Sequence, residues 1–357
     1  MIHGVIMAGG SGTRFWPESR KNRPKQLLNI MGDQTMIRCT IRRILPEIPI
    51  ERITVVTCAS HADEMATQLP ELNKEMIVIE PEGRNTAPCI ALAAYKLHKR
   101  DPDGIMAVMP ADHVIGKEEE FRQALRIAVQ AACQGDHLVT FGVIPHRPET
   151  GYGYIKMGPA HLYVGTATLF KVDRFVEKPD LITAEQYVAS RTYLWNSGMF
   201  VWQITSIIQA FEKYLPAIGT EMKRISPALN TPDESAAIAE AYGRMGAVSI
   251  DHGIMEKADN VLTLPVNVEW NDVGCWASLE DVWKQDECGN ATKGRVMFVD
   301  GKRCVVSSPG KLTAVVGVED LIIVDTPDAL MVCRKDRAQD VRRLQELLKK
   351  QGFEHLL

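Results

Sequence analysis

The chain has 357 residues, of which 45% are hydrophobic and 24% are charged, and its formal net charge is −4. This composition is typical of a globular protein and excludes a disordered or collagen-like chain. The slight acidic excess excludes a protein whose entire surface binds nucleic acid. The chain contains no run of 18 apolar residues, so no membrane span is predicted.

The first 142 residues alternate short apolar runs with longer amphipathic segments. Strands are predicted at 2–8, 53–57, 76–79, 105–109 and 137–141, and helices at 34–45, 60–69, 86–100 and 118–134. This alternation predicts parallel strands joined by right-handed crossovers, and therefore a doubly wound, Rossmann-like α/β sheet. Ligands of such sheets bind at the carboxyl ends of the strands, so we expect the functional site there.

From residue 152 onward the pattern predicts a mixed sheet that closes over the ligand crevice. Strand-like segments at 153–157, 170–177 and 193–201 alternate with helical ones at 184–190, 204–214 and 234–245. A polar linker is predicted at 286–294 and a final amphipathic helix at 338–350. Between them, short β-type runs are predicted at 296–299, 304–307, 313–318, 321–324 and 330–333. We therefore predict a large α/β domain over residues 1–285 and a small β-rich C-terminal domain over residues 293–357.

A glycine-rich loop, Ala8-Gly9-Gly10-Ser11-Gly12-Thr13-Arg14, directly follows the first predicted strand. Backbone amides in such a loop can approach and bind a phosphate group. The loop lacks the third glycine of a dinucleotide-binding fingerprint, because Phe15 occupies that position, and the chain contains no GK[ST] of a P-loop. Five cationic side chains lie between Gly9 and Gln26, which favours an anionic ligand over a plain glycine turn or a solvated basic face.

Segment 9–26, GGSGTRFWPESRKNRPKQ, resembles the signature of the sugar-1-phosphate nucleotidyltransferases. Six further blocks follow in that family's order: EPEGRNTAP (80–88), MPADH (109–113), GYGYI (151–155), FVEKP (175–179), WNSGMF (195–200) and VEWNDVG (268–274). The subset RNTAP, PADH and WNDVG resembles the mannose-1-phosphate guanylyltransferase branch. The resemblance covers about residues 1–285 and implies a GT-A-like fold, with residues 1–285 as the catalytic domain. It also implies a short β-helix-like tail, and the chain is expected to be the short form without an isomerase domain.

The resemblance implies transfer of GMP from GTP to α-D-mannose 1-phosphate, which yields GDP-mannose and pyrophosphate. The attacking phosphate is already anionic at pH 7, so the reaction needs charge neutralisation and alignment rather than a general base. Arg14 and Lys25 are expected to contact the triphosphate and its transition state. Asp112 and Asp272 are expected to be catalytic and to hold Mg²⁺, although each could instead cap a helix or turn.

Two further groups of residues are expected to bind the substrates. The nucleotide is assigned to Ala8, Gly9, Gly10, Gly12, Thr13, Glu80, Arg84, Asn85, Thr86 and Ala87, and the sugar phosphate to Gly151, Glu177, Lys178, Asn196 and Gly198. Glu80 can accept hydrogen bonds from the two adjacent donors of guanine, so we expect it to favour that base. Asn85 and Thr86 could instead cap the predicted helix at 86–100, and Glu177–Lys178 could be a surface dipeptide.

The sequence leaves alternative functions open. A related enzyme could use another sugar 1-phosphate, such as glucose 1-phosphate, or another NTP. The missing third glycine counts against a dinucleotide-dependent oxidoreductase, and the complete set of charged residues counts against a non-catalytic nucleotide-sugar binding protein. We expect no nucleic-acid or membrane partner, a possible homodimer, and a cytoplasmic location, because no secretory signal is present and the eight cysteines form no CxxC pair.

Overall fold

The computed structural model describes residues 1–10 and 12–357. Its larger part is built on a nine-stranded mixed sheet with the strand order β3-β2-β1-β4-β9-β6-β10-β8-β7. The strands are β1 (Ile2–Met7), β2 (Ile53–Cys58), β3 (Ile77–Glu80), β4 (Ile105–Pro110), β6 (Leu138–Val143), β7 (Tyr154–Val164), β8 (Ala167–Val176), β9 (Tyr193–Gln203) and β10 (Val261–Val266). Strands β1 to β4 are parallel, as the alternation predicted, whereas β9 runs antiparallel to both β4 and β6.

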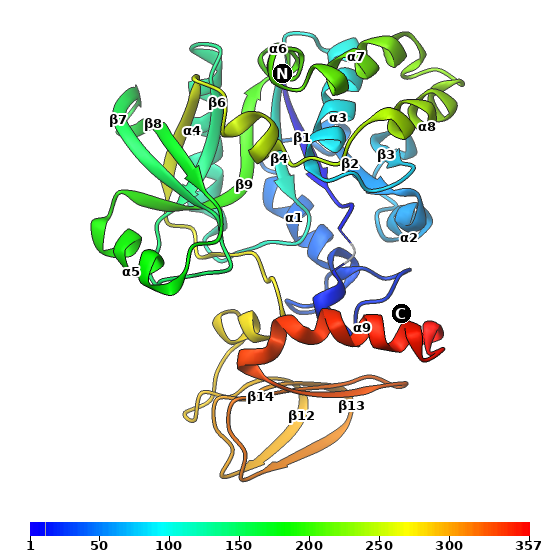
Figure 1. The fold of residues 1–357 in the computed structure, drawn as a ribbon, viewed down its shortest axis with the longest axis vertical. Helices are drawn as coiled ribbons and strands as arrows, with labels where there is room; N and C mark the ends of the chain where they lie inside the picture. The colour runs from blue at the N-terminus through cyan, green and yellow to red at the C-terminus, as the bar shows by residue number, and fades with distance from the viewer. Residues whose placement is uncertain (11) are drawn as a thin grey trace.

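Helices cover both faces of this sheet (Figure 1). They are α1 (Met36–Ile44), α2 (Ala62–Gln68), α3 (Thr86–Arg100), α4 (Glu118–Cys133), α5 (Leu181–Ser190), α6 (Ile204–Tyr214), α7 (Pro216–Ile225) and α8 (Glu234–Arg244). Alternate residues of each buried strand serve opposite faces, because the side-chain period of a strand is two. Ile6 therefore packs in the core under α1 and α4, and its neighbour Val5 packs in the core under α3, α6, α7 and α8.

Short helical turns complete the larger part of the fold. The 3-10 turns are η1 (Thr13–Phe15), η2 (Lys25–Leu27), η3 (Ile50–Arg52), η4 (Ala59–His61), η5 (Lys74–Met76), η6 (Ser226–Ala228) and η8 (Trp276–Asp281), and η7 (Asp251–Met255) is a π-helical turn. A two-stranded antiparallel ribbon joins β5 (Val114–Ile115) to β11 (Trp270–Asn271). This ribbon brings the segment after β4 beside the segment before η8.

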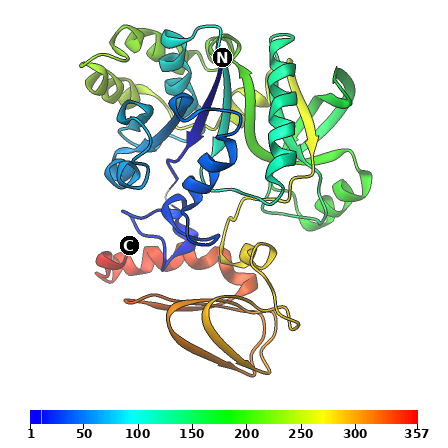
Figure 2. The ribbon, with the colours of Figure 1, turned by 180° about the vertical axis from the view of Figure 1, so that it is seen from behind.

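The C-terminal part is a four-stranded sheet with a helix packed on it. The sheet contains β12 (Ala291–Val299), β13 (Val305–Val316), β14 (Leu321–Asp325) and β15 (Leu330–Arg334), followed by η9 (Lys335–Asp340), α9 (Val341–Lys350) and η10 (Glu354–Leu356). Strands β12, β13 and β14 are parallel, and β15 is antiparallel to β14. Helix α9 lies between this sheet and the loop that follows β1 (Figures 1 and 2).

The predicted linker was wrong at its C-terminal end. Residues Ala291 to Gly294 pair with Val305 to Ser308 as the first half of β12. Their polar composition indicated a loop, but pairing with a buried neighbouring strand overrides composition.

No helix among residues 1–10 and 12–357 combines the length and apolarity that a membrane crossing requires.

Candidate active site

A cavity of about 910 Å³ opens where β1, β3 and β4 end. Its lining includes six of the residues that the sequence assigned to the site: Gly9, Gly10, Glu80, Asn85, Thr86 and Asp112. These residues come from three segments that are distant in the sequence, at 9–10, 80–86 and 112, and the parallel sheet brings the ends of those segments together. The cavity therefore lies at the carboxyl edge of the parallel strands, where the sequence predicts the functional site.

Two glycines of the glycine-rich loop lie where a side chain would be crowded. Gly12 has a φ of 58°, and a Cβ atom there would lie 2.5 Å from the Cβ of Lys25. A Cβ atom on Gly9 would lie 3.2 Å from Oε2 of Glu80. Gln26, which the sequence analysis did not single out, donates from Nε2 to the carbonyls of Ala8 (2.7 Å) and Gly10 (3.0 Å). Ser11 lies outside the described residues.

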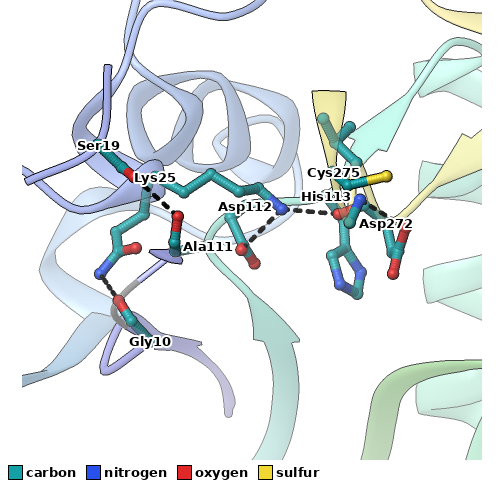
Figure 3. Close-up of polar contacts among 12 residues, drawn as sticks. Gly10, Ser19, Lys25, Ala111, Asp112, His113, Asp272 and Cys275 are labelled. Carbon is teal, nitrogen blue, oxygen red and sulfur yellow. Dashed lines mark hydrogen bonds and ion pairs between the residues drawn. The ribbon is translucent and has the colours of Figure 1, made fainter. Parts of the chain in front are cut away.

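Lys25 joins the two aspartates that the sequence assigned to the metal (Figure 3). Its Nζ lies 2.8 Å from Oδ2 of Asp112 and donates to the backbone carbonyl of Asp272 at 2.7 Å. Lys25 is 5% exposed, so this contact is made in a partly dehydrated environment. Desolvation raises the pKa of the Asp112 carboxyl, but the charge and hydrogen bond of Lys25, together with His113 and a backbone hydrogen bond, outweigh it and hold this pKa below its ordinary value. Asp112 is therefore ionised at neutral pH.

The two aspartates fit a divalent cation by the chemistry of their oxygens. Lys25 contacts Oδ2 of Asp112, and the Gly274 amide donates to Oδ1 of Asp272 at 2.8 Å, so each carboxylate keeps a second oxygen that can act as a ligand. Mg²⁺ is commonly held by one or two carboxylates and completed by phosphate oxygens and water. Asp272 does not cap η8, because the N-cap of that turn is Cys275.

His113 is a packing partner rather than a charge in the site. Burial lowers the pKa of its imidazole to about 4, which leaves the ring neutral at pH 7. Trp270 Nε1 donates to His113 Nδ1 at 3.1 Å and packs edge-on against its ring. This contact ties the end of β4 to the Trp270–Asp272 segment.

Glu80 is a buried carboxyl in the cavity lining. It is 2% exposed, and burial raises its pKa to about 7. The hydroxyl of Tyr242, in α8, donates to Glu80 Oε1 at 3.0 Å and favours the ionised form. Sequence reasoning missed Tyr242 because nothing in the local α8 pattern distinguishes it from a core tyrosine.

At the start of α3 the structure shows the cap that the sequence left open for Asn85, and nucleotide binding by Asn85 and Thr86 stays a prediction. Asn85 is the N-cap of α3, with a φ of 67°, and its side chain accepts a hydrogen bond from the Thr86 amide. The Thr86 hydroxyl accepts from the amide of Ile250 at 2.8 Å. Both residues also line the cavity.

Several residues assigned to the nucleotide lie beside the cavity rather than in its lining: Ala8, Gly12, Thr13, Arg84 and Ala87. Arg84 pairs with Glu82 at 2.5 Å and donates to the carbonyl of Met245. The backbone amide of Ala87 donates to the carbonyl of Val248. These contacts support the loops around the cavity, and a direct nucleotide contact stays a prediction for all five.

Arg14 also lies outside the cavity lining. Its exposed side chain donates from Nη1 to Oε1 of Gln339, in the C-terminal part of the chain, at 3.1 Å.

The residues assigned to the sugar phosphate form a second group beside the cavity. The Asn196 side chain accepts from the Gly198 amide (3.1 Å) and donates to Oδ1 of Asp251 (2.7 Å). Gly198 has a φ of 66° and lies against Pro110, which lines the cavity, so the two regions adjoin. Burial raises the pKa of the Asp251 carboxyl, and the charge of the nearby Glu177 raises it further.

Two of these residues contact neighbours in the sequence rather than Asn196 or Asp251. Lys178 is exposed and forms an ion pair with its neighbour Glu177, and the Gly151 amide donates to Glu149. Asp251, in the π-helical turn η7, is a residue that the sequence analysis missed, because no local pattern connects it to Asn196.

Known proteins resemble the chain over nearly its whole length. A nucleotidyl transferase family model matches residues 3–288, and a model described as a mannose-phosphate isomerase/GMP-like β-helix domain matches residues 294–348. The chain belongs to the nucleotidyl transferase family. Its relatives include a mannose-1-phosphate guanylyltransferase of Klebsiella pneumoniae, 41% identical over 98% of this chain and 74% of that protein. The alginate biosynthesis protein AlgA of Pseudomonas aeruginosa is 40% identical over 98% of this chain and 72% of its own length.

A solved structure agrees with this membership of the nucleotidyl transferases. A protein described as mannose-1-phosphate geranyltransferase from Thermus thermophilus has a TM-score of 0.88 and 32% identity, covering 98% of this chain and 99% of that one. The prediction of a nucleotidyltransferase fold with a β-rich C-terminal part is confirmed. In this nucleotidyl transferase, all of the predicted site residues fall within the first family match, whereas Gln339 falls within the second.

Proposed function

We propose that this nucleotidyl transferase transfers GMP from GTP to α-D-mannose 1-phosphate, releasing pyrophosphate. The observation that carries the proposal is the placement of Lys25 between Asp112 and Asp272 at the edge of a cavity with a buried carboxyl in its lining. The names of relatives about 40% identical over the whole chain support this choice of nucleotide and sugar.

The residues present can promote the transfer by positioning and charge alone. An oxygen of the sugar phosphate attacks the α-phosphorus of GTP in line, and the bond from that phosphorus to the bridging oxygen of the β-phosphate breaks. Lys25 and Arg14 offset the negative charge that accumulates, which brings two mutually repelling anions together. Asp112 and Asp272 would hold Mg²⁺, which when bound polarises phosphate oxygens and stabilises the departing pyrophosphate.

Substrate choice is assigned to two carboxyl groups. Ionised Glu80 accepts from the ring N–H and the exocyclic amine of guanine, whereas uracil and thymine would present an acceptor beside their donor. Glu177 accepts from sugar hydroxyls, and Lys178 offers a charge to the phosphate of the sugar. A carboxylate left opposite the wrong base stays unpaired in the cavity, which is what makes such recognition selective.

Pyrophosphate release tests this proposal. The four NTPs are combined with the 1-phosphates of mannose, glucose and N-acetylglucosamine, each with Mg²⁺ and with EDTA. We expect release only from GTP with mannose 1-phosphate, and none with EDTA. Release from another pair would keep the nucleotidyl transfer but overturn the assigned substrates. No pyrophosphate release from any pair would favour a protein that binds nucleotide sugars without reaction.

A further inference from the structure

The C-terminal part of the chain contacts the glycine-rich loop at a series of nearby residues. Gln345, in α9, donates to the carbonyl of Thr13 at 3.1 Å, and the Trp16 indole donates to the carbonyl of Leu356 at 2.8 Å. Further contacts join Ser307 to Glu18 at 2.7 Å and Arg20 to Asp328 at 2.8 Å. The loop that carries Arg14 is thus held on one side by residues outside the nucleotidyl transferase match.

Arg14 differs from its charged neighbours in the nature of its partner. Arg20 pairs with a carboxylate, Asp328, and Lys25 pairs with Asp112. Among the described residues, Arg14 has no carboxylate within ion-pair distance, and its hydrogen bond goes to the neutral amide of Gln339. An amide oxygen can orient a guanidinium group without cancelling its charge.

Arg14 also lies near the segment that carries Asp272. Burial raises the pKa of the Cys275 thiol, and the Arg14 charge acts in the opposite direction on the same thiol. Within the described residues, the exposed Arg14 guanidinium is hydrogen-bonded at one nitrogen, so its remaining N–H donors are available to an anion.

We propose that Gln339 is a positioning residue, which holds the Arg14 guanidinium toward the triphosphate while leaving its positive charge uncompensated. This inference rests on the proposed function, in which Arg14 contacts the triphosphate of the nucleotide. It also assigns a task to the C-terminal part of the chain, because Gln339 lies in η9, immediately before α9.

Two substitutions at this position separate orientation from charge. Gln339→Ala removes the hydrogen bond, and we expect kcat/KM for GTP to fall about tenfold through a higher KM. Gln339→Glu keeps the shape but pairs with Arg14, so we expect a larger fall in kcat/KM than in Gln339→Ala. The KM for the sugar phosphate is expected to stay unchanged in both. Gln351→Ala and Gln351→Glu, at an exposed position just after α9, are the matched controls and are expected to behave as the wild type.

The Arg14→Ala background shows whether Gln339 acts through Arg14. We expect neither substitution at Gln339 to lower kcat/KM further in that background, since the group it positions is gone. Equal losses with and without Arg14 would overturn the proposal. So would a gain of activity in Gln339→Ala, because the contact would then be restraining Arg14 away from the nucleotide, and so would a Gln339→Glu variant with an unchanged KM.

Nucleotide binding keeps this test separate from that of the proposed function. If the wild type uses another NTP or sugar phosphate, the same comparison is made with that pair. If it releases no pyrophosphate, the dissociation constants of GTP for the wild type, Gln339→Ala and Gln339→Glu are compared by calorimetry. The same order of affinities would support the role of Gln339 although the transfer reaction had failed, and equal affinities or an absence of binding would overturn it.

Discussion

At the scale of single residues, Lys25 is the buried cation that contacts both predicted metal-binding segments. It is almost fully buried and contacts groups from two segments, so its removal leaves Asp112 without its cation. We expect Lys25→Ala to lower kcat by about 10²–10³-fold, equivalent to about 3–4 kcal/mol of transition-state stabilisation, with a native circular dichroism spectrum. Asp272→Ala is expected to have an effect of the same order.

Lys156→Ala is the matched control for that measurement. It removes a Lys–Asp ion pair of similar length, 2.7 Å to Asp173, on the exposed surface of β7 and β8. Exposed pairs contribute little, so activity and stability are expected to stay close to those of the wild type. Turnover of Lys25→Ala within a few-fold of this control would remove Lys25 from the catalytic site.

Glu80 predicts a pH dependence of nucleotide use. Burial raises its pKa to about 7, so the carboxyl takes up a proton as the pH falls below neutral and then presents a donor to the donors of guanine. We expect kcat/KM for GTP to fall in this pH range. The ratio of this kcat/KM in the wild type to that in Glu80→Gln is expected to fall as well. Glu82 is an exposed residue of the same cavity lining, and Glu82→Gln is the control. It corrects for the change of kcat/KM that comes from titration of the substrates themselves. A ratio that does not change with pH would show that backbone groups recognise the base.

The same buried carboxyl predicts a pH dependence of stability. Because the folded-state pKa is raised, the contribution of Glu80 is fully present below its unfolded pKa near 4.5 and is lost as the pH rises through about 7. Relative to the wild type, Glu80→Gln is therefore expected to gain up to about 3 kcal/mol between pH 5 and pH 8. Urea unfolding at both pH values measures this gain, and an equal free-energy difference at the two would contradict the assignment.

At the scale of secondary-structure elements, the π-helical turn η7 brings Asp251 to the Asn196 side chain. Such turns are rare and are frequent at functional sites. We expect Asp251→Asn to raise the KM for the sugar phosphate by about tenfold, because a charged acceptor near Glu177 is lost, with little change in the KM for GTP. Asp259→Asn, on an exposed turn just after η7, is the control. An unchanged KM for the sugar phosphate would assign Asp251 to holding Asn196 alone.

Helices and strands with a clear period were predictable from the sequence. The predicted helix at 86–100 has the bounds of α3, and the predicted strand at 105–109 is one residue shorter than β4. Helix α7 was missed because it follows α6 after one residue, at Pro216, and proline indicates a break although it is well tolerated in the first turn of a helix. Strand β13 was predicted as two runs because Pro309 and Gly310 interrupt its apolar pattern.

At the scale of the whole molecule, the two parts of the chain share one hydrophobic core. This core combines Phe15, Trp16 and Trp276 from the nucleotidyl transferase match with Val305 and Ile322 from the C-terminal sheet. A boundary between 285 and 293 therefore separates sequence segments but does not separate cores. We expect a single cooperative unfolding transition by calorimetry, with equal calorimetric and van't Hoff enthalpies, and two resolved transitions would contradict this.

Trp276 tests what the shared core does for the site. It is 1% exposed, packs against Phe15 at 5.1 Å between ring centroids, and donates to the carbonyl of Trp16 at 3.0 Å. We expect Trp276→Ala to lower stability by about 3–5 kcal/mol and to raise the KM for GTP, because the loop carrying Arg14 loses its support. Trp202→Ala, in the core under α3, is expected to lower stability similarly without raising that KM. Equal KM values in both variants would contradict the supporting role.

The homodimer stays a prediction. Exposed apolar side chains lie on β12 and β13, among them Met297, Val299 and Val316.

The sequence by itself determined the parallel α/β half of the sheet, the glycine-rich loop and the charged residues of the motifs. These features depend on hydrophobic period and on residue types at short spacing, which are local properties of the chain. Tertiary structure alone decided that Lys25 meets Asp272 across 247 residues, that Tyr242 orients Glu80, and that Gln339 reaches Arg14. Such meetings depend on strand order, crossovers and the packing of a distant helix, and no local pattern encodes them.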